Sequence, residues 1–334
     1  MARRARLTAL PLGAALAFSN ASQAPPAVDA TEHTVVIAAG NVGDCFSEGD
    51  EATASLVEET TGIVATLGDT AYPHGSARNF GDCFDPSWGR FRDRIRPVPG
   101  NHDYGTGSAD AYFSYFGEAA GSPGDGYYSY EVGSWHVVAL NSVCDAVGCV
   151  NDSEQLRWLR RDLLAARPDC LLAYWHHPRF SSGSVGSDPR MQAAWRVLLD
   201  AGAEVVISGH SHHYERFGPQ DERGTARHDG IRQFVVGTGG TDLHPVGSTL
   251  INSEAIVAER HGVLRLDLSE SGYAWEFLAA GEELPLDEGQ ASCGERPIQL
   301  ESTVRTLAPA LIAVPVLLIL VTLLLLRRSH FRVH

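Results

Sequence analysis

Four short apolar runs constrain the fold of this chain more than any other feature of its sequence. They are TVVIAA (34–39), GIVATLGD (62–69), CLLAYW (170–175) and EVVISG (204–209), and each ends at glycine or polar residues. Runs of this length and composition are typical of buried strands in α/β folds. Because ligands bind at the carboxyl ends of such strands, the polar residues after each run are the first candidates for function.

Amphipathic helices and further strands fill the intervals between these runs. The segments 151–166 and 188–202 carry apolar residues at helical spacing, and Asp152 with Gln155 is the predicted capping pair of the first. YYSYEV (127–132) and WHVVALN (135–141) are typical of an antiparallel pair, and later strands are predicted in RQFVVGTG, GVLRLDL and YAWEFL. The pattern predicts one α/β domain over residues 31–294.

Composition excludes one class of partner. The chain has 26 basic residues, all of them arginine, against 41 acidic residues, and its formal net charge is −15. A protein this acidic repels the phosphate backbone, so no nucleic-acid partner is expected. The use of arginine alone is typical of GC-rich coding, which favours a bacterial source.

Both ends of the chain predict export. Residues 1–24 combine early arginines with an apolar stretch and small residues, as in a secretory signal peptide; an uncleaved anchor is the alternative. Residues 306–326 carry no charge and are long enough for a membrane span. A linker (295–305) precedes this span and an arginine-bearing tail (327–334) follows it. We therefore expect a single-pass plasma-membrane protein with its main domain outside and its C-terminus in the cytoplasm.

The six cysteines fit an exported domain. They are even in number and none forms a CxxC motif, so disulfides are expected before a zinc–thiolate site. Cys144 and Cys149 are predicted to close a small loop, which would leave Cys45–Cys83 and Cys170–Cys293. The spacing does not determine this pairing.

Five polar stretches follow strand-like runs in order along the chain. They are GNVGD (40–44), GDTAY (68–72), GNHDY (100–104), WHHP (175–178) and GHSHHYER (209–216). Each carries carboxylate, amide, phenol or imidazole groups, which are ligands for zinc, manganese and iron. One such stretch would indicate little, but five in succession predict a metal centre.

The last four stretches resemble the blocks GDxxY, GNH(D/E), His-x-Pro and GHxH of the calcineurin-like metallophosphoesterases, in particular the purple acid phosphatase branch. The resemblance covers residues 34–278. It implies a four-layer α/β/β/α sandwich with two mixed β-sheets, here followed by the C-terminal transmembrane helix. It also implies a metal-dependent phosphoric ester hydrolase with a phosphate-ester substrate and two metal ions, iron with zinc, manganese or a second iron.

The resemblance assigns roles residue by residue. Asp69 would bridge the two metals, and His102 would contact the phosphate and protonate the leaving group. His74 and Arg179 are candidate substrate contacts, with solvent exposure and a structural ion pair as their respective alternatives. The remaining metal ligands would be Asn41, Tyr72 and His212 at the first site, and Asn101, His176 and His210 at the second. For His177 and His213, packing or outer-sphere positions are favoured.

Two positions depart from the family pattern. Position 41 should be an aspartate, and Asn41 removes a negative charge, so the first metal should bind weakly. Asp44 is a less favoured substitute. Val185 stands near the place of a histidine that binds phosphate and donates a proton in relatives.

Two hypotheses follow from these residues. The first is an exported, membrane-anchored phosphoesterase that uses a metal-bound hydroxide. The second is a catalytically impaired homologue that serves as a binding or sensing module at the cell surface.

Overall fold

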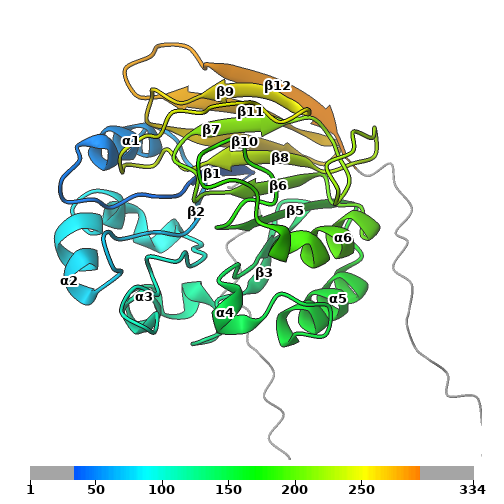
Figure 1. Cartoon of the computed structure of the whole chain (residues 1–334), viewed down its shortest axis with the longest axis horizontal. Coiled ribbons are helices and arrows are strands. Elements are labelled where there is room, and N and C mark those ends of the chain that lie inside the picture. Colours follow the sequence, from blue (N-terminus) through cyan, green and yellow to red (C-terminus); the bar gives the residue numbers. More distant parts are fainter. Residues whose placement is uncertain (1–33, 294–334) are drawn as a thin grey trace, which may run out of the picture. The chain divides into compact units, whose positions relative to one another are not determined.

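Two mixed β-sheets form the centre of the domain in the computed structural model, which describes residues 34–293 (Figure 1). The five-stranded sheet has the order β12-β11-β10-β1-β2, and the seven-stranded sheet has the order β3-β4-β5-β6-β8-β7-β9. The strands are β1 (Val35–Ala39), β2 (Ile63–Thr66), β3 (Tyr128–Val132), β4 (Trp135–Ala139), β5 (Cys170–Trp175), β6 (Val205–Ser208), β7 (Tyr214–Phe217), β8 (Arg232–Val236), β9 (Ser253–Val257), β10 (Gly262–Ser269), β11 (Gly272–Ala279) and β12 (Asp287–Ser292). The predicted pair of mixed sheets is confirmed.

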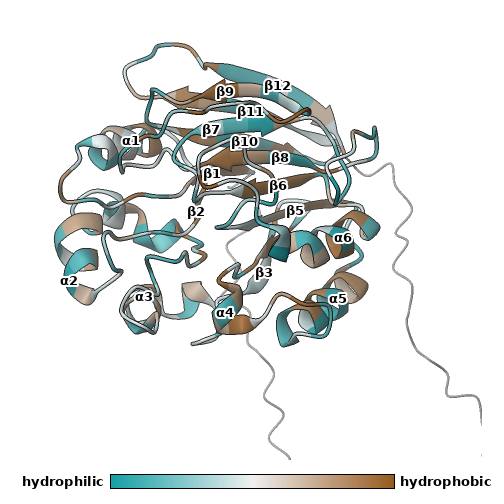
Figure 2. Cartoon of the chain, viewed as in Figure 1, coloured by the Kyte–Doolittle hydropathy of each residue, from teal (hydrophilic) through white to brown (hydrophobic). Residues whose placement is uncertain are grey.

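Alternation along the strands of the seven-stranded sheet creates two hydrophobic cores. In β5, Leu172 and Tyr174 face the five-stranded sheet, while Leu171 and Ala173 belong to a second core that contains residues of α5 and α6. Both faces of this sheet are therefore apolar, which explains why its central strands are continuous hydrophobic runs. Figure 2 shows the apolar centre and the more polar β12 at the edge.

The helices lie outside the sheets. They are α1 (Gly49–Glu58), α2 (Ala77–Asn79), α3 (Asp110–Phe116), α4 (Cys144–Val147), α5 (Glu154–Ala166) and α6 (Gln192–Asp200). Helices α5 and α6 cover the seven-stranded sheet, and α1 packs against β10 of the other sheet. On the outer face of β10 and β11, Arg265 pairs with Asp267 and Glu276. The helical layer on the five-stranded sheet is thus partial.

The sequence-based prediction of the α5 cap was wrong by one residue. The cap is Ser153, whose hydroxyl accepts a hydrogen bond from the Leu156 amide. Gln155 instead lies buried and bridges the backbone N–H and carbonyl of Asn141. A glutamine at this position thus joins the helix to the loop after β4.

Three disulfides pair all six cysteines: Cys45–Cys83, Cys144–Cys149 and Cys170–Cys293. Cys144–Cys149 closes the small loop predicted from the sequence, and the other two pairs are the ones that then remain, although the sequence did not determine them. The first ties the loop after β1 to the segment after α2, and the third ties the start of β5 to the residue that follows β12. The predicted disulfides are confirmed.

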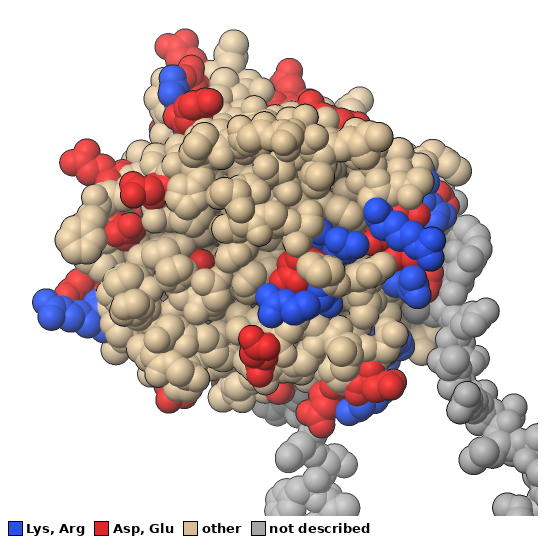
Figure 3. Space-filling view, viewed as in Figure 1, with Lys and Arg blue, Asp and Glu red and all other residues tan. Residues whose placement is uncertain are grey.

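Several charged side chains on the surface lie beside groups of opposite charge. Arginines on the face in Figure 3 have acidic neighbours, and ion pairs include Arg196–Glu222 and Arg190–Asp188. Within residues 34–293 no helix is both long and apolar enough to cross a membrane. The predicted signal peptide, linker, span and tail lie outside the described residues.

Candidate metal centre

The predicted ligands lie just beyond the carboxyl ends of four strands that belong to two different sheets. Asn41 follows β1, Asp69 follows β2, His176 follows β5 and His210 follows β6. Backbone hydrogen bonds join these loops: the backbone N–H group of Asn41 donates to the Gly68 carbonyl, and that of Gly209 donates to the His176 carbonyl. The pairing of strands thereby brings together residues that are up to 169 positions apart.

Three of these residues have a left-handed backbone, with φ angles of +61° at Asn41, +51° at Asp69 and +63° at His210. The only other non-glycine residue with positive φ in residues 34–293 is Arg167, at the end of α5. Such conformations are costly for residues with a Cβ and concentrate at functional sites. The turns after β1, β2 and β6 therefore hold these three side chains in place even though the left-handed backbone conformation costs free energy.

One cluster has the composition of a metal site. The Nε2 atom of His176 lies 3.1 Å from Asp69 Oδ2, 3.1 Å from Asn101 Oδ1 and 3.2 Å from His210 Nδ1. Carboxylate, amide oxygen and imidazole groups converge on one point, as they do in sites for zinc, manganese or iron. These four side chains fit a bound cation. Asn101, His176 and His210 were predicted for the second metal, and Asp69 was predicted to bridge the two metals.

Backbone carbonyls orient two of the imidazoles. The Nδ1 atom of His176 donates to the Leu67 carbonyl at 2.7 Å, and that of His212 donates to the Asp242 carbonyl at 2.6 Å. Since a carbonyl only accepts, each ring turns its Nε2 atom toward the site, as metal-binding histidines do. Burial lowers the pKa of His210 to about 3 and that of His212 to about 4, so both rings are neutral at pH 7.

Asp69 is the buried anion of the site. Its Oδ1 atom accepts the His102 backbone N–H at 2.8 Å, which leaves Oδ2 to face the imidazoles. Burial alone would raise the pKa of Asp69, but the neighbouring His176 and His102 hold it well below its ordinary value. A Cβ on Gly100 would lie 2.2 Å from Asp69 Oδ1, so only glycine allows this loop to approach the carboxylate.

The side chains predicted for the first metal meet in a different way. The Nδ2 atom of Asn41 donates to the Tyr72 oxygen at 2.7 Å, and the Tyr72 hydroxyl donates to Asp69 Oδ2 at 3.1 Å. His212 Nε2 lies 3.5 Å from the same hydroxyl. Burial and the nearby Asp69 raise the pKa of Tyr72 far above its ordinary value, so the phenol is protonated. An amide N–H group occupies the position of a ligand oxygen, and these residues do not fit the first metal as they stand.

His102 lies at the solvent edge of the cluster. Its Nδ1 atom donates to the Pro73 carbonyl at 2.6 Å, and its Nε2 atom lies 4.0 Å from Asp69 Oδ2. The side chain is 37% exposed, whereas those of Asp69 and His176 are buried. The ring therefore directs one nitrogen toward the metal site from the side that a substrate can reach.

Several residues that were considered from the sequence lie apart from this cluster. His74 is exposed, and its ring makes no hydrogen bond within the described residues. The guanidinium of Arg179 donates to the Glu222 carbonyl at 2.7 Å and stacks on Phe180. These contacts favour a structural role for Arg179 over the predicted substrate contact. Asp44 accepts hydrogen bonds from the Phe46 amide and the Thr241 hydroxyl.

Two imidazoles that were not predicted to bind metal lie beside the cluster; for His177, packing or an outer-sphere position was favoured. Ligand atoms of His177, His176 and His210 lie within 4.8 Å of one another, and His177 is also hydrogen-bonded to Ser142. The His244 ring stacks on His212 with centroids 4.3 Å apart. For His177 the signal was present in the double histidine of WHHP, but His244 lies on a loop with no recognisable motif.

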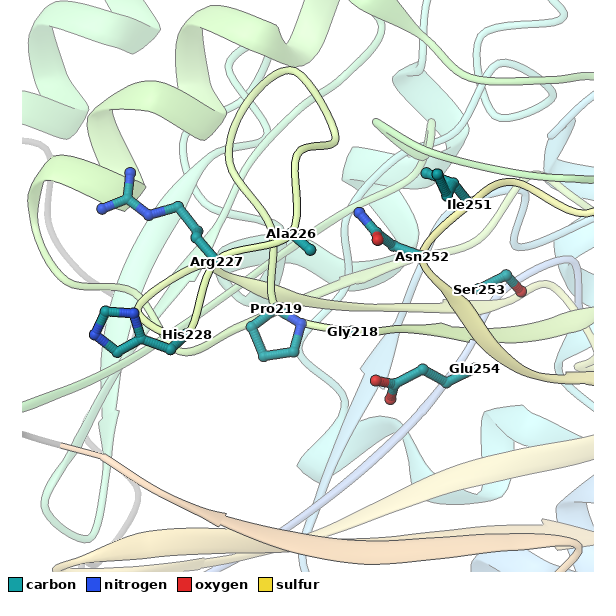
Figure 4. A pocket seen from close by; sticks show the side chains of 9 residues that line it. All are labelled: Gly218, Pro219, Ala226, Arg227, His228, Ile251, Asn252, Ser253 and Glu254. Atoms are coloured by element: carbon teal, nitrogen blue, oxygen red, sulfur yellow. The ribbon is translucent and has the colours of Figure 1, made fainter.

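A separate surface pocket of about 460 Å³ is lined by residues 218–219, 226–228 and 251–254 (Figure 4). None of the predicted metal ligands lines it. Arg227, which projects from one side of this pocket, is paired with Asp229. The pocket is therefore distinct from the metal centre.

Comparison with known proteins gives a consistent family assignment. The calcineurin-like phosphoesterase family matches residues 40–214. Purple acid phosphatase 15 of Arabidopsis thaliana is 25% identical over 214 residues, which cover 53% of this chain and 40% of that protein. An uncharacterized protein of Mycobacterium tuberculosis is 31% identical over 166 residues, which cover 42% of this chain and 31% of that protein. The alignments thus span well under half the length of these relatives.

Solved structures share the fold. A purple acid phosphatase from yellow lupin (Lupinus luteus) seeds matches with a TM-score of 0.61 and 18% identity, over 77% of this chain and 53% of that one. GAP50, described as the anchor in the inner membrane complex of Plasmodium, matches with a TM-score of 0.62 and 15% identity, over 79% and 90% of the two chains. At these identities the likeness concerns the fold alone.

Proposed function

This chain belongs to the calcineurin-like phosphoesterase family, and we propose that it hydrolyses phosphate esters with the help of a bound metal ion. The observation that carries the proposal is the convergence of Asp69, Asn101 and His210 on His176 Nε2 at 3.1–3.2 Å. The family implies a dinuclear metal centre. Within residues 34–293, the side chains predicted to bind metal that fit a cation are those of this cluster.

The metal ion would supply Lewis-acid activation of the phosphoryl oxygens and of the attacking water. The chain's own residues provide the rest. Asp69 supplies the negative charge, and the Leu67 carbonyl orients His176 so that Nε2 faces the cation. Zinc, manganese and iron all suit this donor set.

His102 is the proposed proton donor. Its Nδ1 atom is held by the Pro73 carbonyl, so the proton it can exchange sits on Nε2, toward the metal site. A general acid in this position protonates the leaving oxygen as the ester bond breaks. Asn101 is also exposed, so the substrate would enter along the edge formed by these two residues.

We further propose that the domain works outside the cell, tethered to the plasma membrane by residues 306–326 with the C-terminus inside. The three disulfides support an oxidising compartment. The charge pattern at both ends of the sequence supports the orientation.

Two observations favour the second candidate function, an impaired homologue that binds or senses phosphate esters at the cell surface. Asn41 presents an amide N–H group where the family pattern has an aspartate oxygen. Val185, in place of the expected histidine, is about half exposed and adds no proton donor. Such a protein would bind a phosphate ester without turning it over.

The test is hydrolysis of an aryl phosphate by the full-length chain loaded with zinc, manganese or iron. The active hypothesis predicts turnover that is abolished in His176→Ala and retained in His228→Ala, which removes a fully exposed imidazole outside the site. No turnover with any of the three metals, with phosphate binding preserved, would favour the second candidate. Equal activity in both variants would contradict a role for the cluster.

A further inference from the structure

Two side chains in this site, Asp69 and Asn41, use the same backbone device. Each follows a strand and has a left-handed backbone, and the Oδ1 atom of each accepts a backbone N–H group at 2.8 Å. The donor is His102 for Asp69 and His210 for Asn41. In each case the second terminal atom of the side chain is left to face the site.

The bond from His210 determines which way the Asn41 amide points. A backbone N–H group can only donate, so the atom that faces it must be the carbonyl oxygen of Asn41. The NH₂ group therefore faces the Tyr72 oxygen, 2.7 Å away. The opposite orientation would place two N–H groups against each other in a fully buried position.

Replacing aspartate by asparagine at this position therefore separates two roles. The oxygen that supports the turn after β6 is kept, because Oδ1 still accepts from His210. The atom that would bind the first metal is changed from an anionic oxygen to an NH₂ group, whose lone pair is delocalised into the amide and is not available to a metal. In the Asn41–Tyr72–Asp69 chain, hydrogen bonds join the groups that a cation would otherwise bridge.

Charge points the same way. Apart from the shared Asp69, the first-site side chains are an amide, a phenol and an imidazole, all formally neutral. Two cations in this family's sites lie about 3.5–4 Å apart and repel each other strongly in a buried setting. The single carboxylate of Asp69 can offset the charge of one divalent ion better than the charge of two divalent ions.

We infer that this chain binds a single metal ion, held by Asp69, Asn101, His176 and His210, and that Asn41 closes the first site of the family pair. This inference goes beyond the proposed hydrolysis and does not depend on it. It concerns the number of ions and their ligands.

The test counts metal ions per chain in the full-length protein after loading with zinc, and separately with iron, followed by exhaustive dialysis. The natural chain is expected to hold one ion and, with iron(III), to lack the visible absorption of a phenolate–iron bond. Asn41→Asp is expected to hold two ions and to gain that absorption, which Tyr72→Phe in the same background removes. Asn151→Asp is the matched control: it makes the same charge change while keeping the oxygen that accepts from Arg160.

The natural protein alone can overturn the inference, by holding two ions per chain or by showing phenolate–iron absorption. Asn41→Asp that folds and still holds one ion would also overturn it. If that variant does not fold, Tyr72→Phe in the natural chain decides: an unchanged count supports the inference, and loss of an ion refutes it. Because none of these readouts is hydrolysis, failure of the proposed function would be recognised separately.

Discussion

Asp69 and His102 are joined through the backbone: Asp69 Oδ1 accepts the His102 N–H group at 2.8 Å, while the His102 ring places Nε2 4.0 Å from Asp69 Oδ2. The loop that carries His102 therefore positions both the Asp69 carboxylate and the proposed proton donor. The backbone half of this relationship survives any substitution of the His102 side chain except proline. The two roles can consequently be separated by mutation.

His102→Ala is expected to lower kcat by about 10²–10⁴-fold for alkyl phosphates, because the proposed general acid is lost. The loss should be much smaller for 4-nitrophenyl phosphate, whose leaving group needs no proton. Metal content should stay the same, since the N–H bond to Asp69 remains. Equal losses for both substrates would argue against proton donation, and kcat for each, beside the His228→Ala control, is the measurement.

Gly100→Ala is expected to reduce the free energy of unfolding by about 1–3 kcal/mol, as overpacking typically does. The added Cβ would lie 2.2 Å from Asp69 Oδ1 and 2.4 Å from the Asp69 backbone nitrogen, which has no room to move. Metal affinity should fall as well, because the carboxylate is displaced. Gly81→Ala is the matched control, since its Cβ would meet nothing within 4 Å. Urea unfolding of both variants measures the difference, and equal stabilities would contradict the close approach.

His136 is expected to make the stability of the domain depend on pH. Its buried ring is hydrogen-bonded to Glu131 at 2.7 Å and to Asp162 at 2.8 Å. Burial opposes the charged form, but the two carboxylates win and raise the pKa of His136 to about 9. The unfolded value is about 6.5, so this stabilisation of at most about 3 kcal/mol is complete below pH 6.5. It is lost as the pH rises through 9.

The measurement for His136 is the free energy of unfolding from urea titrations between pH 6 and pH 10. The natural chain should lose stability over this range, and His136→Gln should show a flatter profile because it carries no titrating ring. Parallel profiles for the two proteins would mean that the His136 ion pairs contribute nothing measurable.

The strands that precede the candidate ligands could be predicted from the sequence because their signals are local, and the presence of disulfides could be predicted from the even number of cysteines. Strands β1, β2, β5 and β6 are short apolar runs, and both of their faces are buried. The edge strands β9 and β12 were missed, because SEAIV and DEGQAS carry little of the apolar character that marks a strand. Strand β12 pairs with β11 and β9 pairs with β7, and the sequence does not reveal which strands pair.

The candidate ligands were likewise identified from short motifs, but their geometry was not accessible from the sequence. The expectation that Asn41 weakens the first site follows from its chemistry alone. The direction of its amide depends on the His210 N–H group, 169 positions away, and on the turn that presents it. The same holds for His244, which reaches His212 only through the loop after β8.

The most direct test of the metal centre is anomalous X-ray diffraction from crystals of the zinc-loaded chain, recorded on both sides of the zinc absorption edge. The account predicts one anomalous peak about 2.0–2.2 Å from Asp69 Oδ2, His176 Nε2 and His210 Nδ1. It predicts no peak between Tyr72 and His212. A peak at that second position, or no peak beside His176, would contradict it.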